Sequence, residues 1–173
     1  DVYKRQDTER VLKTLKALGI PRYRWDGFSY KDGVGIPDQL AEMKPRMGEL
    51  AAMNRQFGVC AMYHTHSGIG RVGASMWDLY LLLKDFDTNF VSANFDVGHA
   101  TVEGGFGGWI HSTRLMMPFT RGIAVKDFKW ARNAKAEWRP EWCALGQGMV
   151  DFKKFLPMVK AAAFRGPLQL HMA

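Results

Sequence analysis

The segment Asn94-Phe95-Asp96-Val97-Gly98-His99-Ala100 directly follows the apolar run Phe90-Val91-Ser92-Ala93. A run of β-branched and aromatic residues that stops at an aspartate indicates a buried strand ending in a carboxylate. Because His99 follows three residues later, the strand would deliver a carboxylate and an imidazole to one mouth of a sheet. The alternative is that Asp96 only caps a loop and that His99 is an ordinary polar loop residue. Four further segments bear on this choice.

The composition is that of a folded globular protein. The 173 residues suffice for one domain with a sizeable core, and 47% of them are apolar and 13% aromatic. The formal charge of +7 would favour anionic partners such as phosphorylated small molecules or nucleic acid. The basic residues are nevertheless spread along the chain without long blocks of like charge, which favours a solvated surface over nucleic-acid binding.

The cysteines and the length of the apolar runs indicate the cellular compartment. Cys60 and Cys143 stand alone, without the spacing of a thiolate metal site, and fit a reducing, cytoplasmic location. The apolar runs, such as 79–83, are far too short to span a bilayer. Residues 1–6 have no initiator methionine and no periodicity, and they resemble translated adapter sequence. We therefore expect a non-native leader there, and the absence of an export signal carries little weight.

Hydrophobic spacing predicts alternating helices and strands along the chain. We expect helices at 7–18, 37–57, 75–86 and 151–163, a weaker helix reaching Met117, and strands at 22–27, 59–63, 90–96, 122–127 and 168–172. Ser75 and Asp78 form a capping-box-like start for the third helix, and Asp151 is the expected cap of the last one. The polar segment 133–148 is expected to be a long loop.

This alternation predicts an α/β fold with a parallel sheet and helical crossovers. Polar residues follow the strands, and the C-terminal ends of strands are where a (β/α)8 TIM barrel carries its site. A complete barrel has eight strands and about 250 residues. We therefore expect an incomplete TIM barrel with about five parallel strands over residues 7–173, whose two unpaired edges would make the isolated chain poorly soluble.

Four pieces in a fixed order carry a family resemblance. They are Tyr63-His64-Thr65-His66-Ser67-Gly68, Phe95-Asp96-Val97-Gly98-His99-Ala100, Val125-Lys126-Asp127-Phe128, and Leu145-Gly146-Gln147-Gly148-Met149-Val150-Asp151-Phe152 leading to Gly166-Pro167-Leu168-Gln169-Leu170-His171. From Asp7 to its end the chain resembles the xylose isomerase-like TIM barrels, the sugar phosphate isomerases and epimerases that are grouped with the apurinic endonucleases of the endonuclease IV type. The resemblance implies that residues 7–173 are the later five β/α units of the barrel.

The resemblance also implies a metal site. In this family a divalent cation is commonly held by a Glu, an Asp, a His and a second Glu at four successive strand ends. The Asp is matched by Asp96, and a substrate-contacting His by His99. The first Glu falls on His64, which can still ligate a metal, whereas the His falls on Ala124 and the second Glu on Ala173, which offer no ligand. The expected cofactor is therefore Mn, Mg, Co or Zn bound by His64 and Asp96, with two ligands of the family pattern lacking.

Three residues are expected to be catalytic. Strand alternation puts Ala124 and Lys126 on one face, so the Lys126 ammonium could bind a carbonyl, enolate or phosphate oxygen at the barrel mouth. A salt bridge to a neighbouring loop is the alternative. His66, His99 and Lys126 would orient hydroxyls and relay protons. For His64 and His66 the alternative is one packed and one hydrogen-bonded histidine.

The expected substrate-binding residues are Arg24, Asp127 and His171. Arg24 ends the first strand and could meet an anionic substrate, although a surface role is equally open. The glycine-rich stretch 103–108 matches neither a dinucleotide-binding nor a P-loop pattern, and we interpret it as a flexible loop.

Together these features predict a sugar or sugar phosphate isomerase or epimerase that transfers a proton next to the carbonyl of a ketose or aldose with the help of a divalent metal. A metal-free, non-catalytic sugar-binding barrel is the first alternative, favoured by Ala124 and Ala173. An apurinic-site endonuclease ranks last, because 5 histidines are few for several zinc ions. The expected partner is a small sugar or sugar phosphate, without nucleic acid or membrane; a homo-oligomer stays open.

Overall fold

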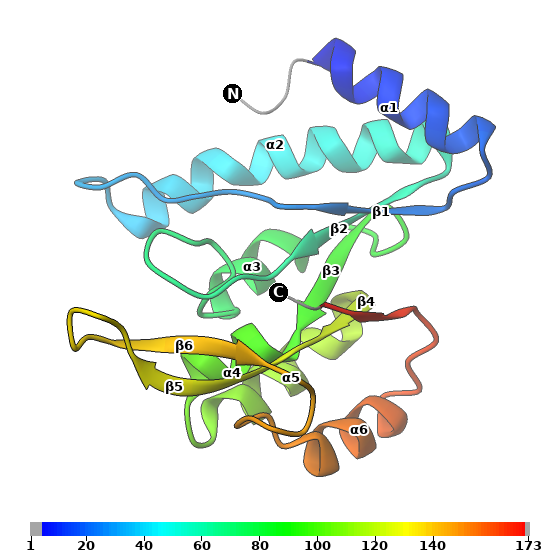
Figure 1. The fold of residues 1–173 in the computed structure, drawn as a ribbon. Coiled ribbons are helices and arrows are strands. Elements are labelled where there is room, and N and C mark those ends of the chain that lie inside the picture. The colour runs from blue at the N-terminus through cyan, green and yellow to red at the C-terminus, as the bar shows by residue number, and fades with distance from the viewer. Residues whose placement is uncertain (1–4, 172–173) are drawn as a thin grey trace.

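The computed structural model of the protein describes residues 5–171 and has an alternating α/β order (Figure 1). The elements are α1 (Arg5–Ala17), β1 (Arg22–Trp25), α2 (Ile36–Phe57), β2 (Cys60–His64), α3 (Trp77–Leu83), β3 (Val91–Asp96), α4 (Val97–Gly104), α5 (Gly108–Met116), the 3-10 helix η1 (Met117–Phe119), β4 (Thr120–Val125), β5 (Asp127–Arg132), β6 (Trp138–Cys143), α6 (Phe152–Ala161) and β7 (Leu168–Leu170).

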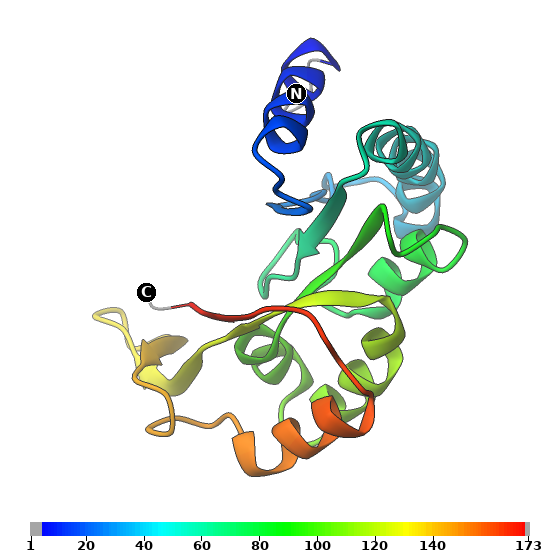
Figure 2. The same ribbon diagram turned by 90° about the vertical axis from the view of Figure 1, so that its right-hand side faces the viewer.

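Five strands form one parallel sheet in the order β1-β2-β3-β4-β7, so that each strand lies beside the next one in the chain apart from the inserted β5 and β6. The sheet is curved, and α2, α3, α5 and α6 follow its convex side (Figure 2). This arrangement is part of a (β/α) barrel, which confirms the predicted α/β class, the parallel sheet and the incomplete TIM barrel.

The central strands form because both of their faces are covered. Every residue of β2 and β3 is buried, including the polar Ser92, Asn94 and Asp96 of β3. The ring of Phe95 on β3 stacks on that of Phe155 on α6 at 6.1 Å between centroids. Tyr63 on β2 accepts a hydrogen bond from the Phe28 backbone N–H at 2.9 Å, which fixes the segment after β1. Gly27 makes this approach feasible, because a Cβ there would lie 2.0 Å from the Tyr63 ring.

Two of the predicted helix ends are confirmed. Helix α2 has a proline in its first turn and ends at Gly58, which adopts the left-handed conformation that glycine tolerates best. Asp151 caps α6 and accepts a hydrogen bond from the Lys154 N–H at 2.9 Å. None of the described helices is both long and apolar enough to cross a membrane.

The segment 133–148 corrects one prediction, since it is not a long loop. Strand β6 pairs antiparallel with β5, and the two strands form a separate hairpin that extends from the sheet next to β4 (Figure 1). Pro140 lies opposite Trp130 in this two-stranded ribbon, where the missing N–H of a proline is tolerated at an edge. The turn is closed by the Asn133 N–H, which donates to the Glu137 carbonyl at 3.0 Å.

Several predicted boundaries also differ. The third helix starts at Trp77, after Met76 in the left-handed conformation, and Ser75 donates to the Asp78 side chain instead of capping a backbone N–H. Helix α1 already includes Arg5 and Gln6, so these two residues of the expected leader are helical, and residues 1–4 lie outside the described part. The last strand ends at Leu170; Met172 and Ala173 also lie outside the described residues.

Candidate functional site

Asp96 is the centre of a group of polar side chains at the C-terminal ends of the strands. It is the last residue of β3 and the N-cap of α4, and its carboxylate is fully buried. Its Oδ1 accepts a hydrogen bond from the His99 N–H at 3.1 Å. Its Oδ2 lies 3.2 Å from His171 Nδ1, 3.7 Å from His64 Nε2 and 3.9 Å from His99 Nε2. Three imidazoles therefore surround one buried carboxylate, as the sequence predicted for His99.

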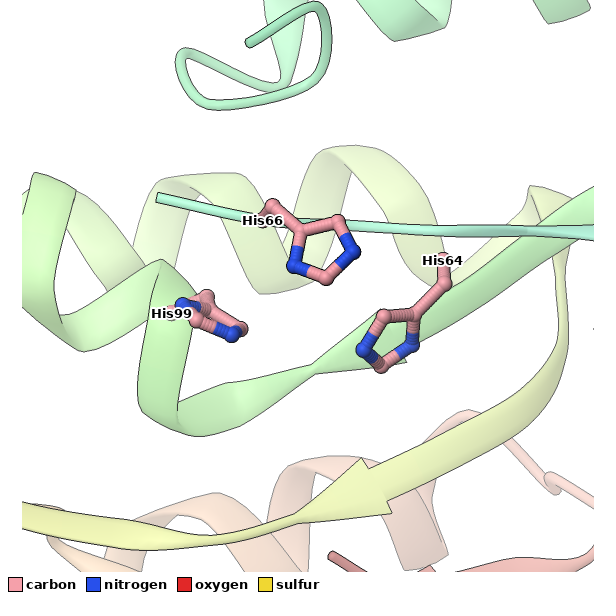
Figure 3. Close-up of side chains that lie close together, drawn as sticks. All are labelled: His64, His66 and His99. Carbon is pink, nitrogen blue, oxygen red and sulfur yellow. The ribbon is translucent and has the colours of Figure 1, made fainter. Parts of the chain in front are cut away.

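The histidines come from different elements and meet edge to face. His64 ends β2, His66 follows it by two residues, and His99 lies in the first turn of α4 (Figure 3). The ring centroids of His64 and His66 are 4.6 Å apart, and those of His66 and His99 are 5.2 Å apart. Ligand atoms lie within 4.8 Å of one another in two groups, His64 with His66 and His99, and His64 with Asp96 and His171. His64 belongs to both.

Burial keeps the imidazoles of His64, His66 and His99 neutral. It is the main cause that lowers the pKa of His64 to about 2, with the positive charge of Arg24 as the next cause. Burial, followed by the charge of Lys126, lowers the pKa of His99 to about 3, and burial also lowers the pKa of His66. A neutral imidazole nitrogen has a lone pair, which is the form that binds a metal ion. Burial raises the pKa of Asp96, partly opposed by the hydrogen bonds to its carboxylate.

His64 is held at one nitrogen and open at the other. Its Nδ1 lies 3.1 Å from Asn94 Nδ2, which also donates to Gln169 Oε1 at 3.1 Å. Its Nε2 is buried and has no hydrogen-bond partner within residues 5–171, although it is only 3.7 Å from Asp96 Oδ2. A buried nitrogen without a partner next to a carboxylate is the arrangement that a bound cation would satisfy.

Lys126 also reaches the site and packs against an aromatic ring that the sequence did not point to. Only 7% of its surface is exposed, and its Nζ lies 3.7 Å from the ring centroid of Trp142 on β6. The ring of Trp142 in turn contacts His99 at 4.8 Å. Among the described residues no carboxylate lies within 4.0 Å of this ammonium, so the expected alternative of a loop salt bridge is wrong. Gly98 leaves the space, because a Cβ there would lie 2.5 Å from Lys126 Cγ.

The remaining predicted residues are placed differently. Arg24 is exposed at the rim and pairs with Asp26, whose carboxylate lies 3.8 Å from His66 Nε2. His171 joins Asp96 directly. Asp127 is not brought into the group, because its buried carboxylate accepts hydrogen bonds from the backbone N–H groups of Gly146, Gly148 and Val150. Its place at the end of the predicted strand 122–127 suggested a site residue, whereas it is the first residue of β5 and organises a loop.

Two further positions matter for the chemistry. Ala124 pairs with Asp96 across β3 and β4 and is buried, so its side chain adds no ligand beside the carboxylate. Ser67, which was not among the expected site residues, lies 2.7 Å from His99 Nδ1 through its Oγ and orients that ring. Its position between His66 and Gly68 in the polar segment after β2 is the signal that could have revealed it.

A separate hollow of about 380 Å³ lies away from these residues. It is bordered by α1, β1 and α2 and lined by side chains that include Trp25, Arg46 and Met53. None of the grouped histidines or carboxylates lines it. Because chemistry needs reactive groups as well as space, we place the candidate site at Asp96 and the histidines.

The sequence matches the family described as the xylose isomerase-like TIM barrel over residues 2–173. The chain belongs to this family. The membership confirms the resemblance carried by the four ordered motifs of the sequence. No curated protein matches the chain by sequence.

Solved structures of the same fold are similar to the chain. A xylose isomerase domain protein from Planctomyces limnophilus is 21% identical with a TM-score of 0.74, over 96% of this chain and 58% of that one. The IOLI protein with a bound zinc atom is 14% identical with a TM-score of 0.80, over 96% of this chain and 59% of that one. A D-allulose 3-epimerase from Methylomonas sp. in complex with D-allulose is 16% identical with a TM-score of 0.70, over 94% of this chain and 53% of that one. The chain thus spans less than two thirds of these proteins' length.

Proposed function

We propose that this chain carries part of the active site of a sugar epimerase or isomerase, which moves a proton at the carbon next to the carbonyl of a ketose or aldose. The observation that carries the proposal is the buried carboxylate of Asp96 surrounded by three imidazoles at the C-terminal ends of parallel strands. Membership of the xylose isomerase-like family supports it, and so does the likeness in fold to an epimerase that binds D-allulose.

The residues present fit a divalent cation. His64 Nε2, an oxygen of Asp96 and a ring nitrogen of His171 would hold it, and this nitrogen-rich donor set suits zinc, cobalt or manganese better than magnesium. Three protein ligands leave a position for a substrate oxygen. When bound, such an ion would polarise the carbonyl and acidify the neighbouring C–H. For His64 to bind through Nε2 its proton must be on Nδ1, and the Asn94 amide, whose Nδ2 faces Nδ1 in this structure, would turn over to present its oxygen there.

The chain's own side chains then have separate roles. His66 is more accessible than His64 and His99 and faces both of them, so it would exchange a proton with the substrate. His99, oriented by Ser67, would hold a substrate hydroxyl. The ammonium of Lys126 would stabilise negative charge that develops on the carbonyl oxygen. Arg24 at the rim would accept the phosphate of a sugar phosphate.

The metal content of the full-length protein tests the proposal. We expect about one equivalent of zinc, cobalt or manganese after purification without chelator, because the two groups of three possible ligands share His64 and can hold one ion at a time. The ion should be lost in Asp96→Ala and retained in His111→Ala, whose histidine is exposed and outside the group. No metal in the wild-type protein would exclude the metal-assisted mechanism.

A metal-free sugar-binding barrel is a second candidate, which Lys126 favours. Ala124 lies on β4, at a position where a ligand of the family pattern is lacking. Lys126, whose side chain is nearly buried, directly follows this strand. An ammonium can bind a sugar oxygen without a metal. Sugar binding that persists unchanged in EDTA, and is lost in Lys126→Met, would favour this candidate over the epimerase.

A further inference from the structure

One face of the β5–β6 hairpin carries a row of aromatic rings. The cross-strand pairs Phe128 with Trp142, Trp130 with Pro140, and Arg132 with Trp138 lie on this face because side chains alternate along a strand. We call these six residues the aromatic strip. The opposite face is polar, with Lys129 and Glu141 in a salt bridge of 2.8 Å.

The strip begins inside the candidate site and runs outward. At its inner end the Trp142 ring lies 3.7 Å from Lys126 Nζ and 4.8 Å from the His99 ring. Phe128 follows, at 6.0 Å from Trp142 and 5.6 Å from Trp130. At the outer end Trp130 and Trp138 are exposed, by 41% and 59%. Phe128 itself is buried and supports the rings on either side, so the accessible rings are the half-buried Trp142 at the site and Trp130 and Trp138 beyond it.

The hairpin is anchored at its base. Both oxygens of the Asp127 carboxylate accept backbone hydrogen bonds from the segment that follows β6, at 2.9 to 3.0 Å. From Trp142 to Trp138 the strand covers four residues, or about 13 Å at the usual rise of a strand. The strip is therefore a fixed wall that is longer than one sugar ring.

The chemistry of the strip favours a sugar over other ligands. The C–H faces of a pyranose stack on indole rings, and its hydroxyls can bond to neighbouring charged side chains. The charges of the hairpin are largely neutralised within it, because Lys129 pairs with Glu141 and Arg139 with Glu137. The guanidinium of Arg132 stacks on Trp138 at 5.0 Å. A nearly neutral aromatic surface of this kind offers little attraction to the phosphates of a nucleic acid.

We propose that the aromatic strip binds the second sugar unit of a glycoside or disaccharide whose first unit lies at Asp96 and the histidines. The inference rests on the proposed function and specifies its substrate class. Trp142 contacts the first unit, and Trp130 and Trp138 stack on the second. The preferred substrates are thus extended sugars, and free monosaccharides bind more weakly.

Matched pairs of sugars test this proposal by isothermal titration calorimetry on the full-length protein. The probes are D-glucose with cellobiose and D-fructose with lactulose. We expect the disaccharide of at least one pair to bind roughly 3- to 10-fold more tightly, as one or two aromatic stacking contacts would provide. Trp138→Ala should bring the two affinities together and leave monosaccharide binding unchanged. Trp77→Ala, which removes an indole that is 61% exposed on α3, should keep the preference.

The other outcomes separate this inference from the proposed function. Equal affinity for both members of each pair in the wild-type protein overturns the aromatic strip as a subsite, while retained monosaccharide binding leaves the epimerase proposal intact. Failure to bind any of the four sugars overturns the aromatic strip as a subsite, while the metal measurement still decides the proposed function. A loss of preference in Trp77→Ala as large as in Trp138→Ala also overturns the subsite, since the effect would not depend on the hairpin. Circular dichroism of each variant verifies that it is folded.

Discussion

Asp96 uses its two carboxylate oxygens for different tasks. Oδ1 accepts the His99 N–H and caps α4, whereas Oδ2 faces His171 and His64. Both interpretations that the sequence allowed for this residue, a cap and a site carboxylate, are thus compatible with one geometry. The tasks can be separated by mutation, because asparagine caps a helix as well as aspartate does but carries no charge.

We predict that Asp96→Asn weakens zinc binding more than about tenfold, the smallest loss typical of a disturbed metal site. The metal-free variant should be at least as stable as the wild type, because the cap remains and a buried carboxylate is removed. Asp96→Ala should lose zinc binding and also the cap, which is worth about 1 kcal/mol. Competition with a chromogenic chelator and thermal unfolding in EDTA measure the two effects. Zinc binding of wild-type strength in Asp96→Asn would contradict the ligand role.

At the scale of single residues, part of the candidate site could be predicted from the sequence for a physical reason. Side chains at the carboxyl ends of buried parallel strands reach one edge of the sheet, where His64 ends β2, Asp96 ends β3 and Lys126 directly follows β4. The same rule failed for Asp127, because it cannot tell a carboxylate that faces the mouth from one that binds a loop backbone. Trp142 could not be found, since β6, the strand that carries it, lies in the polar segment predicted to be a loop.

At the scale of elements, the β5–β6 hairpin was the main feature that the sequence did not reveal. A proline in a polar segment favours a loop when only that segment is considered, and of the antiparallel partner β5 only Asp127 falls within a predicted strand. Helix α2, by contrast, could be predicted almost to the residue, because its proline start, apolar spacing and glycine end are all local signals.

The hairpin should depend on Asp127 for its position. In Asp127→Ala the N–H groups of Gly146, Gly148 and Val150 lose their acceptor, and we expect the free energy of unfolding to fall by at least about 2 kcal/mol. Glu141→Gln is the matched control on the same hairpin, because it removes only an exposed salt bridge to Lys129, worth at most about 1 kcal/mol. Urea unfolding measures both. Equal effects of the two substitutions would show that the loop does not rely on this carboxylate.

Tyr23 links β1 to α2 and gives the fold a dependence on high pH. Its hydroxyl donates to Asn54 Oδ1 at 3.0 Å, and burial is the main cause that raises its pKa from 10.0 to about 12. Above pH 10 the unfolded chain loses this proton first, so the folded state binds more protons and stability falls as pH rises towards 12. Below pH 10 the contribution is fully present.

We therefore expect the free energy of unfolding of the full-length protein to decrease between pH 10 and 12, and to decrease less steeply in Tyr23→Phe. The difference in slope should correspond to at most one proton, because Tyr30 and Tyr63, whose pKa values are also raised by burial, remain in the variant. Urea unfolding at several pH values measures the slopes. Identical slopes for the two proteins would exclude a contribution of Tyr23.

At the scale of the whole molecule, the parallel sheet and its strand order could be predicted because helices and strands alternate in the sequence. The curvature of the sheet and the distance between strand ends could not, since they depend on packing between residues far apart in the chain. The meeting of His171 with Asp96 is such a case: the sequence placed both at strand ends, but not within 3.2 Å of each other.

The two outer strands of the described sheet lead to a prediction about association. β1 and β7 each have one unpaired edge, and unpaired edges promote pairing between chains. Arginines 22 and 24 place positive charge on β1, which opposes such pairing, whereas Leu168 and Leu170 on β7 are 54% and 61% exposed. The β7 edge should therefore pair with other chains more readily than the β1 edge.

We expect residues 1–173 expressed alone to associate, and Leu170→Lys to raise the fraction of monomer, because a charge on an edge strand disfavours pairing. Leu156→Lys is the matched control: it adds the same charge at a leucine that is 48% exposed on α6, away from the sheet edges. Size-exclusion chromatography with light scattering at several concentrations measures the monomer fraction. If both lysines act equally, general solubility and not the β7 edge controls association. A wild-type chain that is monomeric and melts cooperatively would show that its unpaired edges do not cause association.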